Sequence, residues 1–394
     1  MVKGQVSALV FSTVAMIISF AVWSVIAPIA TTIQDLYELS EVEKSLLVVT
    51  PVILGSLMRI PMGIMTDRFG GKKVYTLTML FLILPLIGAG FADSYFMLLL
   101  CTFFIGMGGA TFAIAVTYVT RWFPPEKQGL VLGIAGIGNL GTAVASFTVP
   151  TIFSHFGLNW VFWGLAIAIG IMAIIFSLGT KELQRPKEIK TFKESLIVLK
   201  DKQTWILSLF YFLTFGGFVA FSLYLPIILQ ETFQLSAVSA GWKVSIFVIV
   251  ATLIRPIGGY CADKFGSQQV LTWLFIGMMI CSILMAFANE SFILFSISCL
   301  VIASLLGAGN GAVFKLVPQV SPNNTGAVTG FVSAIGGIGG FFPPMVLGVI
   351  KSFTGDYSLG FLLLSLFSLL CLLVINWSYS SHVINPLRLI FQKN

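Results

Sequence analysis

The sequence predicts an all-α integral membrane protein, built from twelve transmembrane helices in two pseudo-symmetric six-helix halves. Three features support this fold class: an apolar composition, a regular series of apolar runs, and an internal repeat. Of the 394 residues, 57% are hydrophobic and 9% are charged, and the mean hydropathy is +1.00. Soluble domains carry about 25% charged residues. The composition therefore excludes a soluble enzyme, a disulfide-stabilised secreted domain and a disordered chain.

The apolar runs have the length of membrane-spanning helices. A helix that crosses the hydrocarbon core needs about 20 apolar residues, and short polar breaks separate the runs. The first run is too long for the apolar core of a signal peptide, so it is expected to be the first span. The predicted spans are residues 7–30, 45–64, 74–92, 95–119, 128–152 and 160–179, followed by 204–229, 238–261, 269–288, 292–316, 326–350 and 357–379.

One longer polar stretch, residues 181–203, divides the spans into two sets of six. We therefore expect an N-terminal half (1–180), a cytoplasmic linker (181–203) and a C-terminal half with a short cytoplasmic tail (204–394). The linker is rich in lysine and arginine. Such a basic segment is predicted to tether the halves and to place an amphipathic helix on the lipid surface.

The distribution of basic residues predicts the orientation in the membrane. Seventeen lysines and arginines fall on the side of the two termini, whereas Lys44, Lys243 and Lys351 fall on the other. Cytoplasmic loops are enriched in basic residues. Both termini are therefore predicted to be cytoplasmic, in a multi-pass protein of the cytoplasmic (inner) cell membrane. The net charge of +7 has this origin and does not indicate nucleic-acid binding.

An internal repeat relates the two halves. Residues Arg59 to Gly70 and Arg255 to Gly266 share an arginine, a glycine, an aspartate followed by a basic residue, a phenylalanine and a final glycine, at a constant offset. Parallel repeats of this kind build transporters with a substrate site at the repeat interface. The run Gly63-x-x-x-Asp67-Arg68-x-Gly70-x-Lys72-Lys73 resembles the loop 2–3 signature of the major facilitator superfamily, which implies the major facilitator fold.

Two arginines lie at membrane depth. Arg59 and Arg255 each precede their aspartate by eight residues, so each is expected about 12 Å inside the boundary of the core. Placing an arginine at that depth costs about 2.5–3.5 kcal/mol. Snorkelling to the interface or pairing with a buried acid are the alternatives. However, all fifteen acids fall at the ends of spans or in loops. Two guanidinium groups without a carboxylate are suited to hold a small oxyanion bidentately from both sides.

The absence of a mid-membrane acid also argues against a proton relay of the Asp/Glu type, and both histidines lie outside the spans. The five cysteines lie in apolar runs without metal-ligand spacing, so neither a metal nor a cofactor is expected. No nucleophile, metal cluster or acid/base motif indicates an enzyme.

Two spans are rich in glycine, which allows transmembrane backbones to touch and slide. The match of Gly136 to Gly141 to a dinucleotide fingerprint is spurious because no strand precedes it. The glycines expected to act as hinge or packing positions are Gly133, Gly136, Gly138 and Gly141 in span 5, and Gly330, Gly336, Gly337, Gly339 and Gly340 in span 11.

These glycine runs resemble the two signatures of the nitrate/nitrite porter family, and Gly106 to Phe112 and Tyr211 to Gly216 are similar to that family as well. The resemblance implies that Arg59 and Arg255 grip the substrate, that Phe112 and Phe215 flank the anion, and that Tyr211 and Asn139 donate to it. From the residues alone, a transmembrane phenylalanine is more often a packing residue. Asn139 is a better candidate because a polar amide in a glycine face requires a partner.

Charged residues at the ends of spans 2 and 8 are assigned to a conformational gate: Asp67, Arg68, Asp263 and Lys264. A carboxylate at a helix end can accept from a basic residue or a helix N-terminus in one state and release it in another. A static cap with a topological role is the alternative. Lys315 is interpreted as a topological charge.

The expected function is secondary active transport of nitrate and nitrite across the cytoplasmic membrane by alternating access, as nitrate/nitrite exchange. The alternatives are proton- or sodium-coupled nitrate import and, in a different class, a small-anion channel. The expected partners are nitrate, nitrite and the lipid bilayer, and the protein is expected to function as a monomer.

Overall fold

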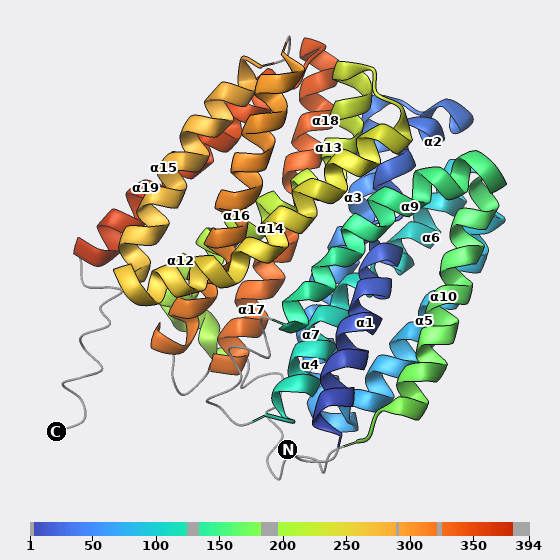
Figure 1. Cartoon of the computed structure of the whole chain (residues 1–394), viewed down its shortest axis with the longest axis horizontal. Coiled ribbons are helices and arrows are strands. Elements are labelled where there is room, and N and C mark those ends of the chain that lie inside the picture. The colour runs from blue at the N-terminus through green and yellow to red at the C-terminus, as the bar shows by residue number, and fades with distance from the viewer. Residues whose placement is uncertain (1–3, 124–133, 183–195, 289–290, 321–324, 381–394) are drawn as a thin grey trace.

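The computed structural model describes residues 4–123, 134–182, 196–288, 291–320 and 325–380. Throughout these ranges the regular structure is helical, and the described residues contain no strand. The helices form two groups that lie side by side (Figure 1): α1–α10, drawn in blue to green, and α12–α19, drawn in yellow to red. The all-helical fold class is confirmed.

In the first group several predicted spans are broken into shorter helices. The helices are α1 (Gln5–Trp23), η1 (Ala27–Ile29), α2 (Ala30–Tyr37), α3 (Glu41–Leu57), α4 (Arg59–Phe69), α5 (Gly71–Gly90), α6 (Tyr95–Ile105), α7 (Met107–Thr120), η3 (Ile137–Asn139), α9 (Leu140–Phe156) and α10 (Leu158–Gly179).

The second group follows the same order of spans after a short η4 (Leu196–Lys200). Its helices are α12 (Lys202–Tyr211), the π-helical turn η5 (Phe212–Gly216), α13 (Gly217–Phe233), α14 (Ala237–Phe265), α15 (Ser267–Ala286), α16 (Phe292–Val320), α17 (Thr325–Ile338), α18 (Phe342–Thr354) and α19 (Ser358–Ser380).

Within the described ranges, ten helices are long and apolar enough to cross a membrane, or eleven if α3 and α4 count as one bent span. The predicted span 128–152 begins outside the described residues, and α9 covers only its second part. The count of twelve therefore remains a prediction. The other predicted spans coincide with helices or helix pairs whose ends differ by a few residues.

The break between α3 and α4 has a local cause. Pro61 lacks the amide hydrogen that would bond to the carbonyl of Leu57, and its ring collides with that carbonyl. The two helices consequently meet at an angle of 41° at Met58. This break places Arg59 at the first position of α4.

The internal repeat is visible in the backbone. Gly70 ends α4 with φ 94°, and Gly266 ends α14 with φ 88°. Only glycine adopts this region without strain, so it allows an abrupt turn into the next helix. The two glycines occupy matching places in the repeat predicted from the sequence.

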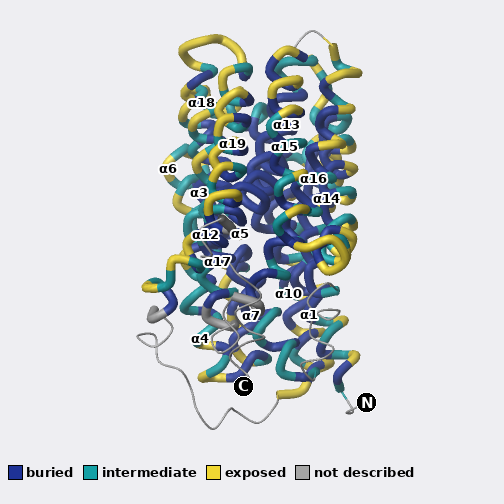
Figure 2. Tube along the Cα trace, turned by 90° about the vertical axis from the view of Figure 1, so that its left-hand side faces the viewer, coloured by how far each residue is buried: buried dark blue, intermediate teal, exposed yellow. Residues whose placement is uncertain are grey.

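Burial follows the expected distribution for a membrane bundle. Buried residues concentrate where the helices meet, and exposed residues occupy the periphery (Figure 2). The exposed surface includes large apolar side chains such as Leu84, Phe96 and Trp273. Many exposed large apolar side chains are typical of a surface that contacts hydrocarbon.

Helix packing in the first group includes a close approach between α9 and α1. A Cβ on Gly141 of α9 would overlap the carbonyl oxygen of Ile17 in α1. We expect Gly141→Ala to destabilise the protein by about 1–3 kcal/mol because the two backbones must separate. Thermal unfolding of the detergent-purified protein measures this. Gly164→Ala in α10 is the matched control, since a Cβ there meets nothing within 4 Å. Equal melting temperatures for the two variants would contradict this account of the packing.

Candidate functional site

The centre of the bundle contains a buried cation. Arg59 is 2% exposed, at the start of α4. Its Nη1 donates to the carbonyl oxygen of Ser333 in α17 at 2.6 Å, and its Nε has no hydrogen-bond partner among the described residues. The contact with Ser333 crosses from one group of helices to the other. Arg59 therefore lies at the interface of the two groups.

Two phenyl rings flank the Arg59 guanidinium. Its Cζ lies 5.2 Å from the ring centroid of Phe112 in α7 and 5.1 Å from that of Phe215 in η5. Both distances are within the range of cation–π attraction. The structure thus brings together three of the residues that the sequence resemblance selected, from three different spans.

The π-helical turn η5 contributes to an aromatic pair that contacts the second arginine. Such turns interrupt α-helices and are frequent at functional sites. Tyr211, which immediately precedes this turn, and Phe215, which lies within it, stack with an interplanar angle of 3° and a centroid distance of 5.0 Å. Arg255 Nη2 donates to the Tyr211 hydroxyl at 3.4 Å, which links the second arginine to this aromatic pair. Arg255 Nη1 is buried, and no residue in the described part of the chain hydrogen-bonds to it.

The glycines of α17 allow this helix to reach the site. A Cβ on Gly336 would overlap the Tyr211 ring, and one on Gly337 would lie 3.2 Å from Arg59 Cζ. In the neighbouring turn, a Cβ on Gly339 would lie 2.7 Å from the carbonyl oxygen of Phe212, and one on Gly340 would overlap Val219. These four glycines let α17 and the following turn pack directly on α4, α12, η5 and α13.

The remaining predicted residues of spans 5 and 11 lie further from this cluster or have other partners. Asn139, in η3, is fully buried; its Nδ2 donates to the carbonyl of Gly136 at 2.8 Å and its Oδ1 has no partner. No contact joins it to either arginine in the described structure. Gly138 packs on Met16, whereas Gly136 and Gly330 adjoin open space. Gly133 lies outside the described residues.

Chemically, the site presents unpaired positive charge. Among the described residues the ion pairs involve Lys44, Lys315 and Lys351 with Glu41, Asp263 and Glu231, and neither Arg59 nor Arg255 has a carboxylate within 4 Å. Buried charges are normally paired, and buried polar groups are normally hydrogen-bonded. Two guanidinium groups with free donors are therefore suited to hold an anion between them.

The predicted gate residues make their described contacts within their own group of helices. Asp263 of α14 pairs with Lys315 of α16 at 2.6 Å. Lys264 and Arg68 lie over the adjacent Phe265 and Phe69 rings. Asp67, half-buried at the end of α4, lies within electrostatic reach of Arg121. Lys315, interpreted from sequence as a topological charge, thus has a specific partner.

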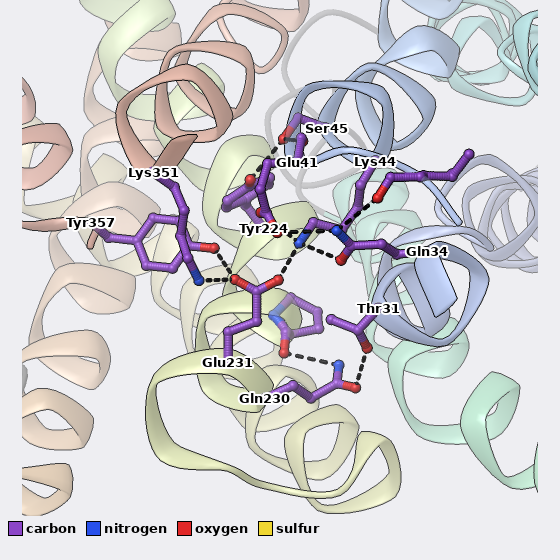
Figure 3. A network of polar contacts seen from close by, with 12 residues as sticks. Thr31, Gln34, Glu41, Lys44, Ser45, Tyr224, Gln230, Glu231, Lys351 and Tyr357 are labelled. Carbon is purple, nitrogen blue, oxygen red and sulfur yellow. Dashed lines mark hydrogen bonds and ion pairs between the residues drawn. The ribbon is translucent and has the colours of Figure 1, made fainter. Parts of the chain in front are cut away.

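A polar network joins the two groups at the end of the bundle opposite the start of α1, here called the far end (Figure 3). Glu231 of α13 accepts from Lys44 of α3, from Lys351 of α18 and from the Tyr357 hydroxyl. Lys44 is 1% exposed and also donates to Glu41 and Gln34, at 2.8 and 2.9 Å.

Two neutral contacts reinforce the same junction. The Thr31 hydroxyl of α2 donates to Gln230 Oε1 of α13 at 2.7 Å, and the hydroxyls of Ser45 and Tyr224 lie 2.8 Å apart. We call Lys44, Glu231 and these two pairs the far-end network. In the sequence its charges indicate only topology, because pairing between residues 187 positions apart leaves no local pattern.

Three features together define a membrane transporter of the major facilitator fold. They are two groups of helices with an apolar exterior, a buried cationic site at their interface, and a polar network that closes one end. The sequence profile of the Major Facilitator Superfamily matches residues 12–344, with a second match at 207–386. Two solved structures of a bacterial homologue of the human lysosomal transporter Spinster, both inward-facing, share the fold. The unoccupied form has a TM-score of 0.73 at 19% identity, covering 98% of each chain. The occupied form has a TM-score of 0.74 at 20% identity, covering 94% of this chain and 96% of that one.

Relatives of higher sequence identity narrow the assignment from the superfamily to one of its families. The nitrite extrusion protein of Bacillus subtilis (strain 168) is 38% identical, with 96% of each chain covered. The probable nitrate transporter NarT of Staphylococcus carnosus (strain TM300) is 40% identical, with 94% of this chain and 95% of the relative covered. The chain belongs to the nitrate/nitrite porter family of the Major Facilitator Superfamily, and it is a multi-pass membrane transporter rather than an enzyme.

The far-end network gives a testable prediction. Glu231→Gln removes the carboxylate that two lysines share, and breaking a buried ion pair costs about 3–5 kcal/mol. We expect the two groups of helices to separate more often at this end. Spin labels on cysteines introduced at the exposed positions Glu38 and Ser352, in a background without native cysteines, should report longer and broader distances.

Asp356→Asn is the matched control, since this exposed carboxylate at the same end accepts only from the backbone amide of Ser358 in the described contacts. A distance distribution that is the same in Glu231→Gln and in the parent would show that the network does not hold the far end together.

Proposed function

We propose that the chain transports nitrate and nitrite across the cytoplasmic membrane by alternating access, and that Arg59 and Arg255 bind the anion. The names of the relatives, nitrite extrusion protein and probable nitrate transporter, support the choice of substrate. The observation that carries the proposal is the environment of Arg59: a buried guanidinium between two phenyl rings, whose Nε has no partner and which has no carboxylate within 4 Å among the described residues.

The shape of this environment favours a planar anion. A flat, delocalised anion can enter between the Phe112 and Phe215 rings while the two guanidinium groups bond to its edge. A tetrahedral phosphate or sulfate is thicker and carries more charge, so it would force the rings apart. Tyr211 donates to the anion through its hydroxyl in this proposal. Asn139 also donates, once its amide turns away from the Gly136 carbonyl.

Anion binding is coupled to the movement of the two halves through Arg59. In the present conformation a carbonyl oxygen of the opposite group, that of Ser333, accepts from Arg59. An anion oxygen competes for the same donor, so binding replaces a contact between the halves with a contact to the substrate. The glycines of α17 around Gly337 allow the helix to shift while remaining close to Arg59.

We assign this conformation to an inward-facing state. The far-end network closes the side opposite the start of α1, and the basic residues clustered on the other side support a cytoplasmic location for both termini. The halves 1–180 and 204–394 then move as units about the central site, joined by the linker 181–203. Asp67, Arg68, Asp263 and Lys264 act at the cytoplasmic gate, where partners from the opposite half become available on closure. A single chain in the bilayer suffices for this cycle.

Charge balance favours exchange over uniport. An empty site leaves two guanidinium groups without a counter-ion, and moving them through the apolar interior is costly. A monovalent anion lowers that cost in both directions. The loaded protein should therefore change conformation faster than the empty one, which couples nitrate entry to nitrite exit.

The bidentate grip can be tested at Arg59. Arg59→Lys keeps the charge but replaces a planar fork of donors with a single ammonium. We expect nitrate uptake into nitrite-loaded proteoliposomes to fall at least about 100-fold, since hydrogen bonds to a charged group contribute about 1.5–3 kcal/mol each. Arg388→Lys, after the last predicted span, is the control and should transport normally. Uptake retained in Arg59→Lys would mean that charge alone is sufficient at this position.

The coupling mode is tested with the same vesicles. Nitrate uptake should be rapid and saturable when nitrite is inside and slow when no anion is inside, whether or not a pH or sodium gradient is applied. Accumulation of nitrate by empty vesicles in response to a proton or sodium gradient would contradict exchange and indicate symport. A nitrate current that does not saturate would indicate a channel.

A further inference from the structure

Asn310 is a buried polar residue in the second group of helices. It lies in α16 between Gly309 and Gly311, and it is 1% exposed. Its Oδ1 is buried without a hydrogen-bond partner among the described residues. Buried amides are normally hydrogen-bonded, so an unpartnered one requires an explanation.

The internal symmetry indicates where Asn310 points. A Cβ on Gly109 of α7 would lie 3.3 Å from Gly55 Cα, and a Cβ on Gly307 of α16 would lie 3.0 Å from Ala251 Cα. Gly55 and Ala251 have the same separation in sequence as the two site arginines. Gly109 and Gly307 are therefore equivalent positions in the two halves.

A second pair of contacts gives the same correspondence. A Cβ on Gly108 would lie 2.6 Å from the carbonyl oxygen of Ser19 in α1. In the other half, a Cβ on Gly217 of α13 would lie 3.0 Å from Leu306 Cδ2 of α16. Gly108 of α7 and Leu306 of α16 are separated by the same number of residues as Gly109 and Gly307. The same separation holds between Ser19 of α1 and Gly217 of α13.

With this correspondence, Asn310 occupies in the second half the place that Phe112 occupies in the first. Each lies three residues after its equivalent glycine. Phe112 faces the Arg59 guanidinium at 5.2 Å. The equivalent direction for Asn310 is toward Arg255, whose Nη1 is also buried without a partner.

Helix periodicity supports this direction independently. Residues four apart share a helix face, and Phe314, one turn after Asn310, packs edge-on against Tyr211 with a centroid distance of 4.7 Å. Tyr211 is the residue that accepts from Arg255. The helix α16 and the turn η5 run in opposite directions. Asn310, one turn before Phe314, therefore lies one turn nearer the far end than Phe314 does. This is the level of Phe215, one turn after Tyr211, and hence of Arg59.

We propose that Asn310 is an additional anion-binding residue, which donates through Nδ2 to the bound anion beside Arg255. Its Oδ1 then accepts from the free Nη1 of Arg255 and orients that guanidinium. This inference rests on the proposed function and adds an asymmetry to it: an aromatic face adjoins the anion on the Arg59 side, and an amide adjoins it on the Arg255 side. An oxyanion with three oxygens, such as nitrate, gains a further donor.

Nitrate binding to the purified full-length protein, measured by isothermal titration calorimetry, tests the proposal. A hydrogen bond to a charged group corresponds to about a 10- to 100-fold change in Kd. We expect Asn310→Leu, which conserves volume, and Asn310→Ala both to raise the nitrate Kd at least about tenfold. The melting temperature of the anion-free Asn310→Leu protein should stay close to that of the parent.

Ser282→Ala in α15 is the control, because this buried hydroxyl donates only to the carbonyl of Met278 in its own helix among the described contacts. It should leave the nitrate Kd unchanged. A parent-like nitrate Kd in either Asn310 variant would overturn the role of Asn310. Absence of nitrate binding by the parent protein would instead refute the proposed function itself, so the two failures are distinguishable.

Discussion

The organisation of this protein depends on the cost of keeping two guanidinium groups inside an apolar bundle, where no carboxylate of the described residues pairs with them. Arg59 reduces that cost with a carbonyl oxygen from the opposite group of helices and with two phenyl rings, and Arg255 with a tyrosine hydroxyl. Neither arrangement satisfies all the donors. In our proposal an anion completes both sets of contacts at once, and for this reason we place substrate binding and the contact between the two halves at the same residues.

Two kinds of interaction hold the halves together, and they differ in what can replace them. The far-end network joins oppositely charged side chains, so opening it requires that the separated charges of Lys44 and Glu231 become hydrated. At the centre, the Arg59–Ser333 contact involves a neutral carbonyl, which an anion readily displaces. Glycines in α17 keep the helices close there without interlocking side chains. A strong polar contact at one end and a replaceable one at the substrate site are what alternation between two states requires.

The sequence predicted the helical spans that the described residues contain, the repeat and the burial of Arg59, because apolar runs and repeated charges are local patterns. It did not predict the π-helical turn at 212–216, the shared carboxylate of Glu231 or the pairing of Lys315 with Asp263, since these depend on packing between distant segments. The sequence does not indicate a role for Asn310, because a lone amide in an apolar run resembles a packing residue. Only the contacts of its glycine neighbours show its equivalence to Phe112.

The central claim is that the two arginines share one planar anion. A structure of the protein determined with nitrate is the most direct test. The account predicts one anion between the guanidinium groups of Arg59 and Arg255, between the Phe112 and Phe215 rings, with the Arg59–Ser333 hydrogen bond lengthened or lost. An anion bound elsewhere, or an Arg59–Ser333 contact unchanged beside a nitrate-free centre at saturating nitrate, would contradict it.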